Sequence, residues 1–367
     1  MKVLQFICST GFYGAERWIL ALAKHLPDHV DSELVVTLEP GTENLKLVEE
    51  FKSIGPTHAL PMRNKFDMGV ISSLAKLIKE QGVDLIHTHG YKSDIIGVLA
   101  ARKAGIPCVV TPHGFENARD LKLRTFIWAG CQVMRYADAV VPLSRQLLED
   151  VKGFRVADEK IEYIQNGVDL SEVEAVRLTK PETSPFPRKR IGFVGQMISR
   201  KNIEDILDCF DTLYHKRQDV ELVFVGDGDS RPELERYARS LNSSTAIEFL
   251  GFRDDRLQLL RDFDLFVMSS TLEGIPRCLM EACAMETPVA AYDIPGIDQL
   301  IQHQETGLLA PLKDKDALLS CWETLLNDDE QAKRLGRNAR EFVETHFSAK
   351  RMAGEYMTLF DRLLGAR

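Results

Sequence analysis

Short apolar runs alternate with longer amphipathic stretches along the first half of the chain. The short runs have the length and composition of buried β-strands and comprise Val3–Ile7, Ser32–Thr37, Leu85–His87, Cys108–Val110 and Ala139–Val141. The longer stretches repeat apolar residues at helical spacing over Ala15–Leu26, Gly69–Gln81, Ser93–Ala104, Leu121–Tyr136 and Ser144–Val151. Strands that alternate with helices in this way predict a parallel sheet covered by helices on both faces.

The alternation breaks between residues 171 and 189, where Pro181, Pro185 and Pro187 stand among few apolar residues. This composition favours an interdomain linker. Beyond it the pattern resumes, with predicted strands at Ile191–Val194, Glu221–Val225, Ala246–Leu250, Leu265–Met268 and Pro288–Tyr292. A chain of 367 residues is also too long for one ordinary hydrophobic core. We therefore expect two doubly wound α/β domains, at residues 1–175 and 188–348.

Composition and charge narrow the classes of partner. The formal net charge is −9 and the excess acid is concentrated in the C-terminal half, so no basic stripe suggests a nucleic-acid partner. The seven Cys residues are odd in number and form no C-x-x-C pair, which predicts free thiols in a reducing compartment, the cytoplasm. No apolar run is long enough to cross a membrane as a helix.

The most informative local feature is a pair of carboxylates eight positions apart, Glu273 and Glu281. The apolar run Leu265–Met268 precedes the pair, and Pro276 suits the start of a helix that would carry Glu281. The backbone amides of Gly274 and Ile275 would then lie near a helix N-terminus, which attracts anions. Two carboxylates around an anion seat suit a ligand with hydroxyls at both ends and phosphates between them, as in a nucleotide sugar.

With this pair, the chain resembles the retaining glycosyltransferases of family 4, whose E-x7-E motif Glu273 and Glu281 match. Further segments carry the resemblance over nearly the whole chain: Gly11–Glu16, Thr111–Gly114, Asn166–Asp169, Phe193–Gly195 running to Arg200–Lys201, Phe224–Gly228 and Pro295–Ile297. The resemblance implies the GT-B fold, in which two Rossmann-like domains face a central cleft. It also implies that the C-terminal helix, within residues 349–367, crosses back to the first domain. The first domain would then meet the acceptor and the second the donor.

The resemblance assigns three catalytic residues. Lys201 would stabilise the departing phosphate, Glu273 would address the donor sugar, and His113 would border that sugar. The family usually has an Arg directly after Gly195, where this chain has Gln196, so one expected cation is missing. Arg200 could compensate, although a residue adjacent to Lys201 normally points elsewhere.

The remaining donor-binding positions implied by the resemblance are mostly backbone contacts. Glu281 would accept hydrogen bonds from the ribose hydroxyls. The full donor-binding set comprises Gly14, Gly195, Gln196, Lys201, Gly226, Asp227, Phe252, Arg253, Gly274, Ile275 and Glu281. Of the two other histidines near strand ends, we expect His87 to be buried against the sheet and His89 either to line the acceptor side or to be structural.

No metal site or cofactor is expected. The pairs Asp262/Asp264 and Asp227/Asp229 have the D-x-D spacing of metal-dependent transferases, but short carboxylate pairs are more often structural. A metal-free reaction needs a Lys or Arg to meet the leaving phosphate. The resemblance implies front-face displacement with retention. An inverting enzyme would need a positioned base, for which Asp94 and Glu116 are candidates in predicted loops.

These observations predict a cytoplasmic retaining glycosyltransferase that moves a sugar from a nucleoside-diphosphate sugar to a glycan or lipid-linked acceptor, in surface polysaccharide or lipopolysaccharide synthesis. The segment Leu121–Trp128 mixes apolar and basic residues and could contact a membrane peripherally, or pack on its own domain. Two alternatives remain: a nucleotide-sugar epimerase of the same fold, and a nucleotide-sugar-binding protein with weakened catalysis, which Gln196 would favour.

Overall fold

The computed structural model describes residues 1–367 except 10, 40–44, 65–66, 115–120, 180–186 and 366–367. The chain divides into two compact units. Unit 1 comprises Met1–Gly167 and Ala349–Arg367, and unit 2 comprises Val168–Ser348. The first boundary lies earlier than the Pro-containing segment suggested, because residues 170–177 form a helix that packs on two helices of unit 2.

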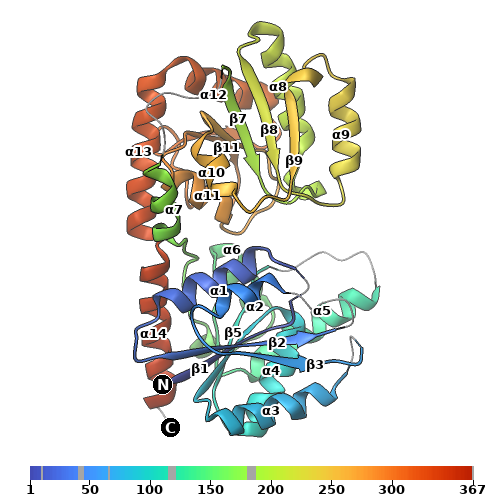
Figure 1. Ribbon diagram of the computed structural model, residues 1–367, viewed down its shortest axis with the longest axis vertical. Coiled ribbons are helices and arrows are strands. Elements are labelled where there is room, and N and C mark those ends of the chain that lie inside the picture. Colours follow the sequence, from blue (N-terminus) through green and yellow to red (C-terminus); the bar gives the residue numbers. More distant parts are fainter. Residues whose placement is uncertain (10, 40–44, 65–66, 115–120, 180–186, 366–367) are drawn as a thin grey trace. The chain divides into compact units, whose positions relative to one another are not determined.

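Each unit is a three-layer α/β structure built on a parallel six-stranded sheet (Figure 1). The strands of unit 1 are β1 Lys2–Ile7, β2 Asp31–Leu38, β3 Thr57–Pro61, β4 Leu85–His89, β5 Cys108–Thr111 and β6 Ala139–Val140. Its helices are α1 Gly14–His25, α2 Lys46–Phe51, α3 Gly69–Gln81, α4 Tyr91–Ala104, α5 Leu121–Val133, η1 Met134–Tyr136, α6 Arg145–Gly153, η2 Asp158–Lys160 and α14 Ala349–Gly365.

Unit 2 repeats this plan. Its strands are β7 Lys189–Val194, β8 Val220–Val225, β9 Ile247–Gly251, β10 Leu265–Met268, β11 Val289–Asp293 and β12 Leu308–Pro311. Its helices are α7 Leu170–Arg177, η3 Ser199–Lys201, α8 Ile203–Lys216, α9 Arg231–Ser240, η4 Ser244–Ala246, α10 Arg256–Arg261, α11 Arg277–Ala284, α12 Lys315–Asn327 and α13 Asp329–His346.

The strand order is the same in both sheets when the strands of each unit are numbered from its own first strand and the second sheet is read from its opposite edge. It is β3-β2-β1-β4-β5-β6 in unit 1 and β12-β11-β10-β7-β8-β9 in unit 2. The order reverses between β1 and β4, and again between β10 and β7. In open parallel sheets, ligands bind outside the carboxyl ends of the strands at such a reversal. Topology alone therefore points to the loops after β1, β4, β7 and β10.

Side chains of β1 alternate between the two faces of the sheet, as the pleat of a strand requires. Val3 and Ile7 belong to the hydrophobic cluster that includes α1 and α14, whereas Leu4 and Phe6 belong to the cluster beneath α3 and α4. Gln5 lies on the first of these faces and is fully buried, so an uncharged polar group is built into an otherwise apolar core.

The C-terminal helix α14 completes the core of unit 1. Its residues Met352, Tyr356 and Phe360 lie in the same buried cluster as Trp18 and Leu22 of α1. In Figure 1 the red helix α14 runs beside the blue helix α1. The expectation that this helix returns to the first domain is confirmed.

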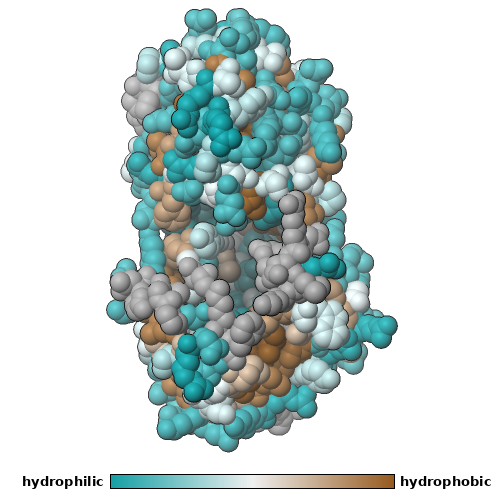
Figure 2. Space-filling view, turned by 90° about the vertical axis from the view of Figure 1, so that its right-hand side faces the viewer, coloured by the Kyte–Doolittle hydropathy of each residue, from teal (hydrophilic) through white to brown (hydrophobic). Residues whose placement is uncertain are grey.

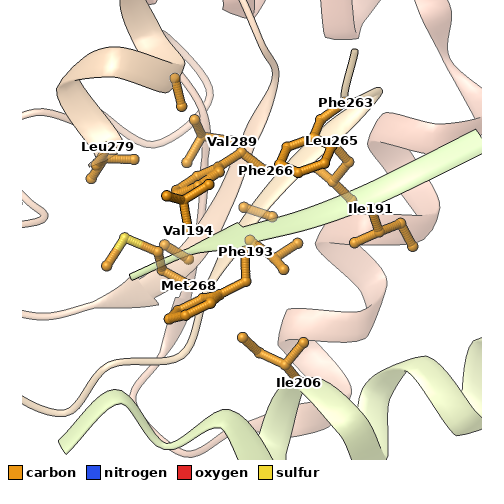
Figure 3. Close-up of a cluster of buried hydrophobic side chains, with 14 of the residues drawn as sticks. Ile191, Phe193, Val194, Ile206, Phe263, Leu265, Phe266, Met268, Leu279 and Val289 are labelled. Carbon is orange, nitrogen blue, oxygen red and sulfur yellow. The ribbon is translucent and has the colours of Figure 1, made fainter. Parts of the chain in front are cut away.

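The core of unit 2 is formed where strand residues meet α8 and α11. Phe193, Phe266 and Met268 are fully buried and lie in one cluster with Ile206 of α8 and Leu279 of α11 (Figure 3). The chain enters unit 2 at Val168, whose N–H donates to the Phe347 carbonyl at 2.7 Å just before the chain leaves at Ser348. The two connections between the units therefore lie side by side.

Candidate active site

The loops that follow β7 and β10 carry the central charged residues of unit 2. Lys201 ends the short η3 helix after β7, and Glu273 ends the segment 269–273 after β10. Both side chains are buried, with Lys201 6% and Glu273 5% exposed, and they form an ion pair through Nζ and Oε1. Buried charges require such a partner. The structure thus brings together two of the residues predicted as catalytic, at the reversal of strand order.

A second cation lies at the same carboxylate. Nη1 of Arg200 is 3.6 Å from Oε2 of Glu273, so each carboxylate oxygen faces a different positive group. The Arg200 side chain is 45% exposed, whereas that of Lys201 is 8% exposed. The position of Arg200 next to Lys201 in the sequence had suggested that its side chain points away from the site. Instead, it points towards Glu273.

Hydrogen bonds fasten the two loops to each other. Oγ of Ser269 donates to the carbonyls of Lys201 and Asn202 at 3.0 and 2.7 Å, and the N–H of Thr271 donates to the Arg200 carbonyl at 2.8 Å. Asn202 has a left-handed conformation, with φ of +49°, which turns the chain sharply into α8. These bonds hold Lys201 and Arg200 at a fixed distance from the segment that carries Glu273.

Two glycines allow the backbone segments of the site to approach one another. A Cβ on Gly296 would lie 1.7 Å from the Gly274 carbonyl oxygen, and one on Gly226 would lie 1.9 Å from that of Gly195. Both have positive φ, +97° and +136°, which L-residues with a side chain rarely adopt. Pro276 is the N-cap of α11, so Gly274 and Ile275 immediately precede this helix, close to the predicted arrangement.

Glu281 lies one turn into α11 and is held by two arginines. Arg256 donates to both carboxylate oxygens, at 2.7 and 3.2 Å, and Nε of Arg277 donates to Oε1 at 2.8 Å. Burial alone would raise the pKa of Glu281, but the charges of Arg256 and Arg277 outweigh it and lower the pKa to about 2. Glu281 is therefore ionised and oriented at neutral pH.

The other predicted donor-binding residues lie around these loops. Gln196 is exposed directly after β7, and an ideal Cβ on its neighbour Gly195 would lie 3.9 Å from Cε of Lys201. The Asp227 carbonyl accepts from the Met197 N–H at 2.9 Å, which ties the loop after β8 to the loop after β7. Phe252 is 51% exposed after β9, while the adjacent Arg253 makes a two-bond pair with Asp255.

In unit 1, the loop after β1 leads into the N-terminus of α1. Glu16 caps this terminus, because Oε2 accepts from the Tyr13 N–H at 2.9 Å and Oε1 lies 2.7 Å from the Ser9 hydroxyl. Gly14 begins the helix, is exposed, and has nothing within 4 Å of where a Cβ would lie. A side chain at this position would therefore meet no neighbouring atom.

A cluster of three histidines lies at the carboxyl ends of β4 and β5. Nδ1 of His89 is 3.2 Å from Nε2 of His113, and Nε2 of His89 is 2.9 Å from Oε1 of Gln5. His87 instead contacts the Thr111 hydroxyl at 2.7 Å, and that hydroxyl lies 2.8 Å from the Tyr356 hydroxyl. His87 is buried, as expected, and His89 is buried too, with its nitrogens engaged inside the unit.

Burial keeps this cluster neutral. Desolvation lowers the pKa of His113 to about 4 and, together with the neighbouring imidazoles, lowers the pKa of His89 well below its usual value. If His89 donates from Nε2 to Gln5, its Nδ1 must accept, and His113 must donate from Nε2. The orientation of the Gln5 amide thereby determines which nitrogens of both histidines carry a proton.

The acidic candidates that the sequence offered have other partners. Asp262 pairs with Arg261, and Asp264 accepts from the Arg190 N–H at 2.7 Å. Asp94 is not in a loop: it lies inside α4, fully buried, with its Oδ1 accepting from Thr88 at 2.7 Å. Glu116 lies outside the described residues. Over those residues, no group of three His, Cys, Asp or Glu side chains is arranged to hold a metal ion.

Sequence reasoning did not identify Arg256 or Arg277 as partners of Glu281. Arg277 stands four positions before Glu281 on one helix, and this spacing alone could have indicated a pair. Arg256 lies on α10, and nothing local in the sequence connects it with α11. Gln5 was likewise overlooked, although a Gln in the centre of a buried strand was a signal of an internal hydrogen-bond partner.

Among the residues that the structure describes, every helix is either too short or too polar to cross a lipid bilayer. Trp128 on α5 and Tyr136 on η1 are 63% and 59% exposed. They stand eight residues apart along nearly continuous helical structure. Arg102 of α4 lies over the Tyr136 ring, 5.3 Å from its centroid.

The chain is similar to known glycosyltransferases along most of its length. Residues 12–172 match the family described as Glycosyltransferase Family 4, and residues 177–342 match the family described as Glycosyl transferases group 1. The Escherichia coli UDP-Gal:alpha-D-GlcNAc-diphosphoundecaprenol alpha-1,3-galactosyltransferase is 28% identical, over 92% of this chain and 86% of its own.

Two further similarities extend over almost the full length. The Campylobacter jejuni N,N'-diacetylbacillosaminyl-diphospho-undecaprenol alpha-1,3-N-acetylgalactosaminyltransferase is 23% identical, over 94% of this chain and 95% of its own. The crystal structure of HepE from Anabaena in complex with UDP superposes with a TM-score of 0.83 at 19% identity, over 99% of this chain and 100% of the other. At that identity the likeness establishes the fold, which is GT-B. The chain belongs to glycosyltransferase family 4 and is an enzyme that transfers a sugar from a nucleotide sugar.

Proposed function

We propose that the chain transfers a sugar, with retention of configuration and without a metal ion, from a nucleoside-diphosphate sugar to a lipid-linked glycan. The observation that carries this proposal is the buried pair of Lys201 and Glu273 at the strand-order reversal of unit 2. When the bond between sugar and phosphate breaks, a nearby cation can stabilise the phosphate and a nearby carboxylate can stabilise the sugar. One end becomes an anionic phosphate and the other an electron-poor sugar carbon.

In this reaction the bond between the anomeric carbon and the phosphate oxygen breaks, and the acceptor oxygen bonds to the same carbon. The acceptor proton passes to an oxygen of the departing phosphate. Lys201 stabilises the negative charge that develops on that phosphate, together with the backbone amides of Gly274 and Ile275. Glu273 orients the sugar. His113, neutral at physiological pH, contributes a hydrogen bond to the sugar rather than a charge.

The nucleoside half of the donor is assigned to the edge of unit 2 that carries Glu281. Glu281 accepts hydrogen bonds from the ribose hydroxyls, and the two arginines already bound to it keep its carboxylate ionised for that purpose. Backbone groups near Gly226, Asp227, Phe252 and Arg253 hold the base. UDP is the first nucleotide to test, since HepE binds UDP and the Escherichia coli relative is named for UDP-Gal.

The acceptor is proposed to reach the enzyme at a membrane surface, which places the protein peripherally on the cytoplasmic face. Two of the relatives are named for acceptors linked to undecaprenol. Trp128 and Tyr136 supply exposed aromatic rings of the kind that insert at a lipid interface, with Arg102 beside Tyr136 to meet anionic headgroups. Hydrophobic residues also gather among hydrophilic ones on the face of unit 1 seen in Figure 2.

A direct assay tests the proposal. Purified protein would be incubated with UDP-galactose, UDP-glucose or their N-acetyl forms and with a polyprenyl-diphosphate-linked sugar, and the lipid product followed by mass spectrometry. The expected product carries one added sugar in α-linkage, with release of UDP. Conversion of the donor without any acceptor would identify the epimerase instead. Lack of turnover with every donor and acceptor, despite nucleotide binding, would contradict the transferase assignment.

A separate assay tests the membrane contact. Co-sedimentation with vesicles containing phosphatidylglycerol is expected to fall severalfold in a Trp128→Ala/Tyr136→Ala variant. Tyr237→Ala is the matched control, because Tyr237 is exposed on unit 2 and pairs with Asp208. Equal sedimentation of all three proteins would remove this face from the proposal.

A further inference from the structure

The second cation beside Glu273 has no place in the roles assigned above. Lys201 already neutralises this carboxylate through Oε1, and yet Arg200 approaches its other oxygen. A diphosphate bound next to this carboxylate brings more negative charge than Lys201 alone can balance, and Arg200 supplies a second positive charge at that place.

We infer that Arg200 is a second phosphate-binding cation of this enzyme, which meets the diphosphate of the donor alongside Lys201. The inference rests on the proposed function and adds a residue to it. It accounts for Gln196, which follows Gly195 and carries no charge, because the positive charge is supplied from the opposite end of the same short loop.

The backbone of Arg200 is built into the site rather than left on a free surface. Its carbonyl accepts from both the N–H and the hydroxyl of Thr271, at 2.8 and 3.2 Å. Its Nη1 donates to the Leu272 carbonyl at 3.2 Å. Both contacts are with the segment that leads directly into Glu273. They hold Arg200 on the solvent-exposed side of the ion pair between Lys201 and Glu273.

Exposure distinguishes the roles of the two cations. The ammonium group of Lys201 is nearly buried and can contact only a ligand atom close to Glu273. The side chain of Arg200 is about half exposed, so some of its N–H donors remain accessible to a ligand. A guanidinium has five N–H donors in a planar fork and can bind a phosphate while one donor remains on a carbonyl. Arg200 can thus contact the diphosphate without releasing Leu272.

Isothermal titration calorimetry with UDP and with uridine tests this inference. Arg200→Ala is expected to bind UDP roughly tenfold more weakly or worse, because a charge-assisted hydrogen bond is lost. Its affinity for uridine should match that of the unaltered protein, since uridine has no phosphate. Adding Gln196→Arg to the Arg200→Ala variant should restore most of the UDP affinity by returning a cation to the same loop.

Arg334→Ala serves as the control. It removes the same charge from an exposed position of α13, and should leave both affinities unchanged. An Arg200→Ala protein that binds UDP as tightly as the unaltered protein would overturn the inference even if turnover fell, because Arg200 would then only orient Glu273. Equal losses for UDP and uridine would also overturn it, as the sign of a general structural defect. If the unaltered protein bound none of UDP, GDP and ADP, the proposed function would fail with it.

Discussion

Nε2 of His113 lies 3.2 Å from Nδ1 of His89, so the side chain assigned to the donor sugar is held by a second, buried imidazole. One nitrogen of this pair must carry the shared proton while the other accepts it. Both rings also lie within 5.5 Å of the Trp18 ring, measured between centroids at 5.2 and 5.3 Å. The orientation of His113 is therefore set inside unit 1, before any ligand binds.

The histidine cluster predicts a loss of stability in acid. The folded-state pKa of His87, His89 and His113 is below that of an unfolded histidine, so below about pH 6.5 the unfolded chain takes up protons that the folded chain does not. The free energy of unfolding should fall as the pH is lowered from neutral towards pH 4. Urea denaturation near pH 7.5 and near pH 5 would measure this change. A His89→Gln variant should show a shallower dependence, and an unchanged slope would argue against the buried neutral pair.

Asp94 predicts a dependence of the opposite sign. Burial raises its pKa to about 8, partly opposed by the Thr88 hydrogen bond, so the folded state keeps a proton that the unfolded state loses above about pH 4. Stability from this group is lost as the pH rises towards 8. Between pH 5 and pH 7.5, the free energy of unfolding of Asp94→Asn should therefore rise relative to that of the unaltered protein by up to about 3 kcal/mol. A difference between the two denaturation curves that does not vary with pH would contradict the raised pKa.

For Glu281, the ion pairs complicate the obvious mutation. Glu281→Ala removes the closer partner of the buried Arg256, leaves it only Glu172 at 3.4 Å, and should cost about 3 kcal/mol of stability, whatever the role of Glu281 in binding. Glu281→Gln preserves the shape and is the better probe of the ribose contact. The unaltered protein should bind UDP more tightly than 2′-deoxy-UDP or 3′-deoxy-UDP, and Glu281→Gln should reduce that preference. Calorimetry with the three nucleotides would show it, and a retained preference would place the ribose elsewhere.

Lys201 is expected to act on the transition state more than on the bound donor. Lys201→Ala should lower kcat by roughly 100-fold or more, because a group that meets developing charge is lost, while donor affinity falls less than tenfold. Steady-state kinetics combined with calorimetry would separate the two effects. Equal losses in kcat and affinity would mean that Lys201 binds the donor uniformly instead of stabilising its departure.

The glycines of the two units offer a matched pair of substitutions. A Cβ at position 296 collides with the Gly274 carbonyl, whereas a Cβ at position 14 meets nothing within 4 Å. Gly296→Ala should displace the Glu273–Gly274 segment and remove most activity, whereas Gly14→Ala should leave the thermal midpoint unchanged. Differential scanning fluorimetry and the transfer assay would report both. Full activity in Gly296→Ala would show that this close approach is dispensable.

Most of the fold could be predicted from the sequence because interior strands of a parallel sheet are continuously apolar. The two strands that the pattern did not reveal, β3 and β12, lie at the outer edges of their sheets. Each includes exposed residues, so neither forms an apolar run that stands out from a loop. Helix α7 was hidden for a related reason, since only Val173 along it is buried and Pro181 follows soon after.

The site was partly predictable for a different physical reason. Lys201 and Glu273 follow strands whose carboxyl ends must converge at the reversal of strand order, so topology brings them together. The partners of Glu281 and of His89 are set by packing between elements far apart in sequence. Arg256 reaches Glu281 from α10, and Gln5 reaches His89 from the neighbouring strand. Such contacts depend on how side chains fill the interior, which spacing along the chain does not encode.

The return of α14 to unit 1 determines the order in which the protein can be completed on the ribosome. Unit 2 is one continuous segment and can close its core as soon as it has emerged. Unit 1 lacks Tyr356 and Phe360 until the segment after unit 2 has been synthesised, so its inner face stays open to solvent and to chaperones while unit 2 is being made. The unit whose synthesis starts before the other is thus completed after it, and truncation after Ser348 would leave it unfinished.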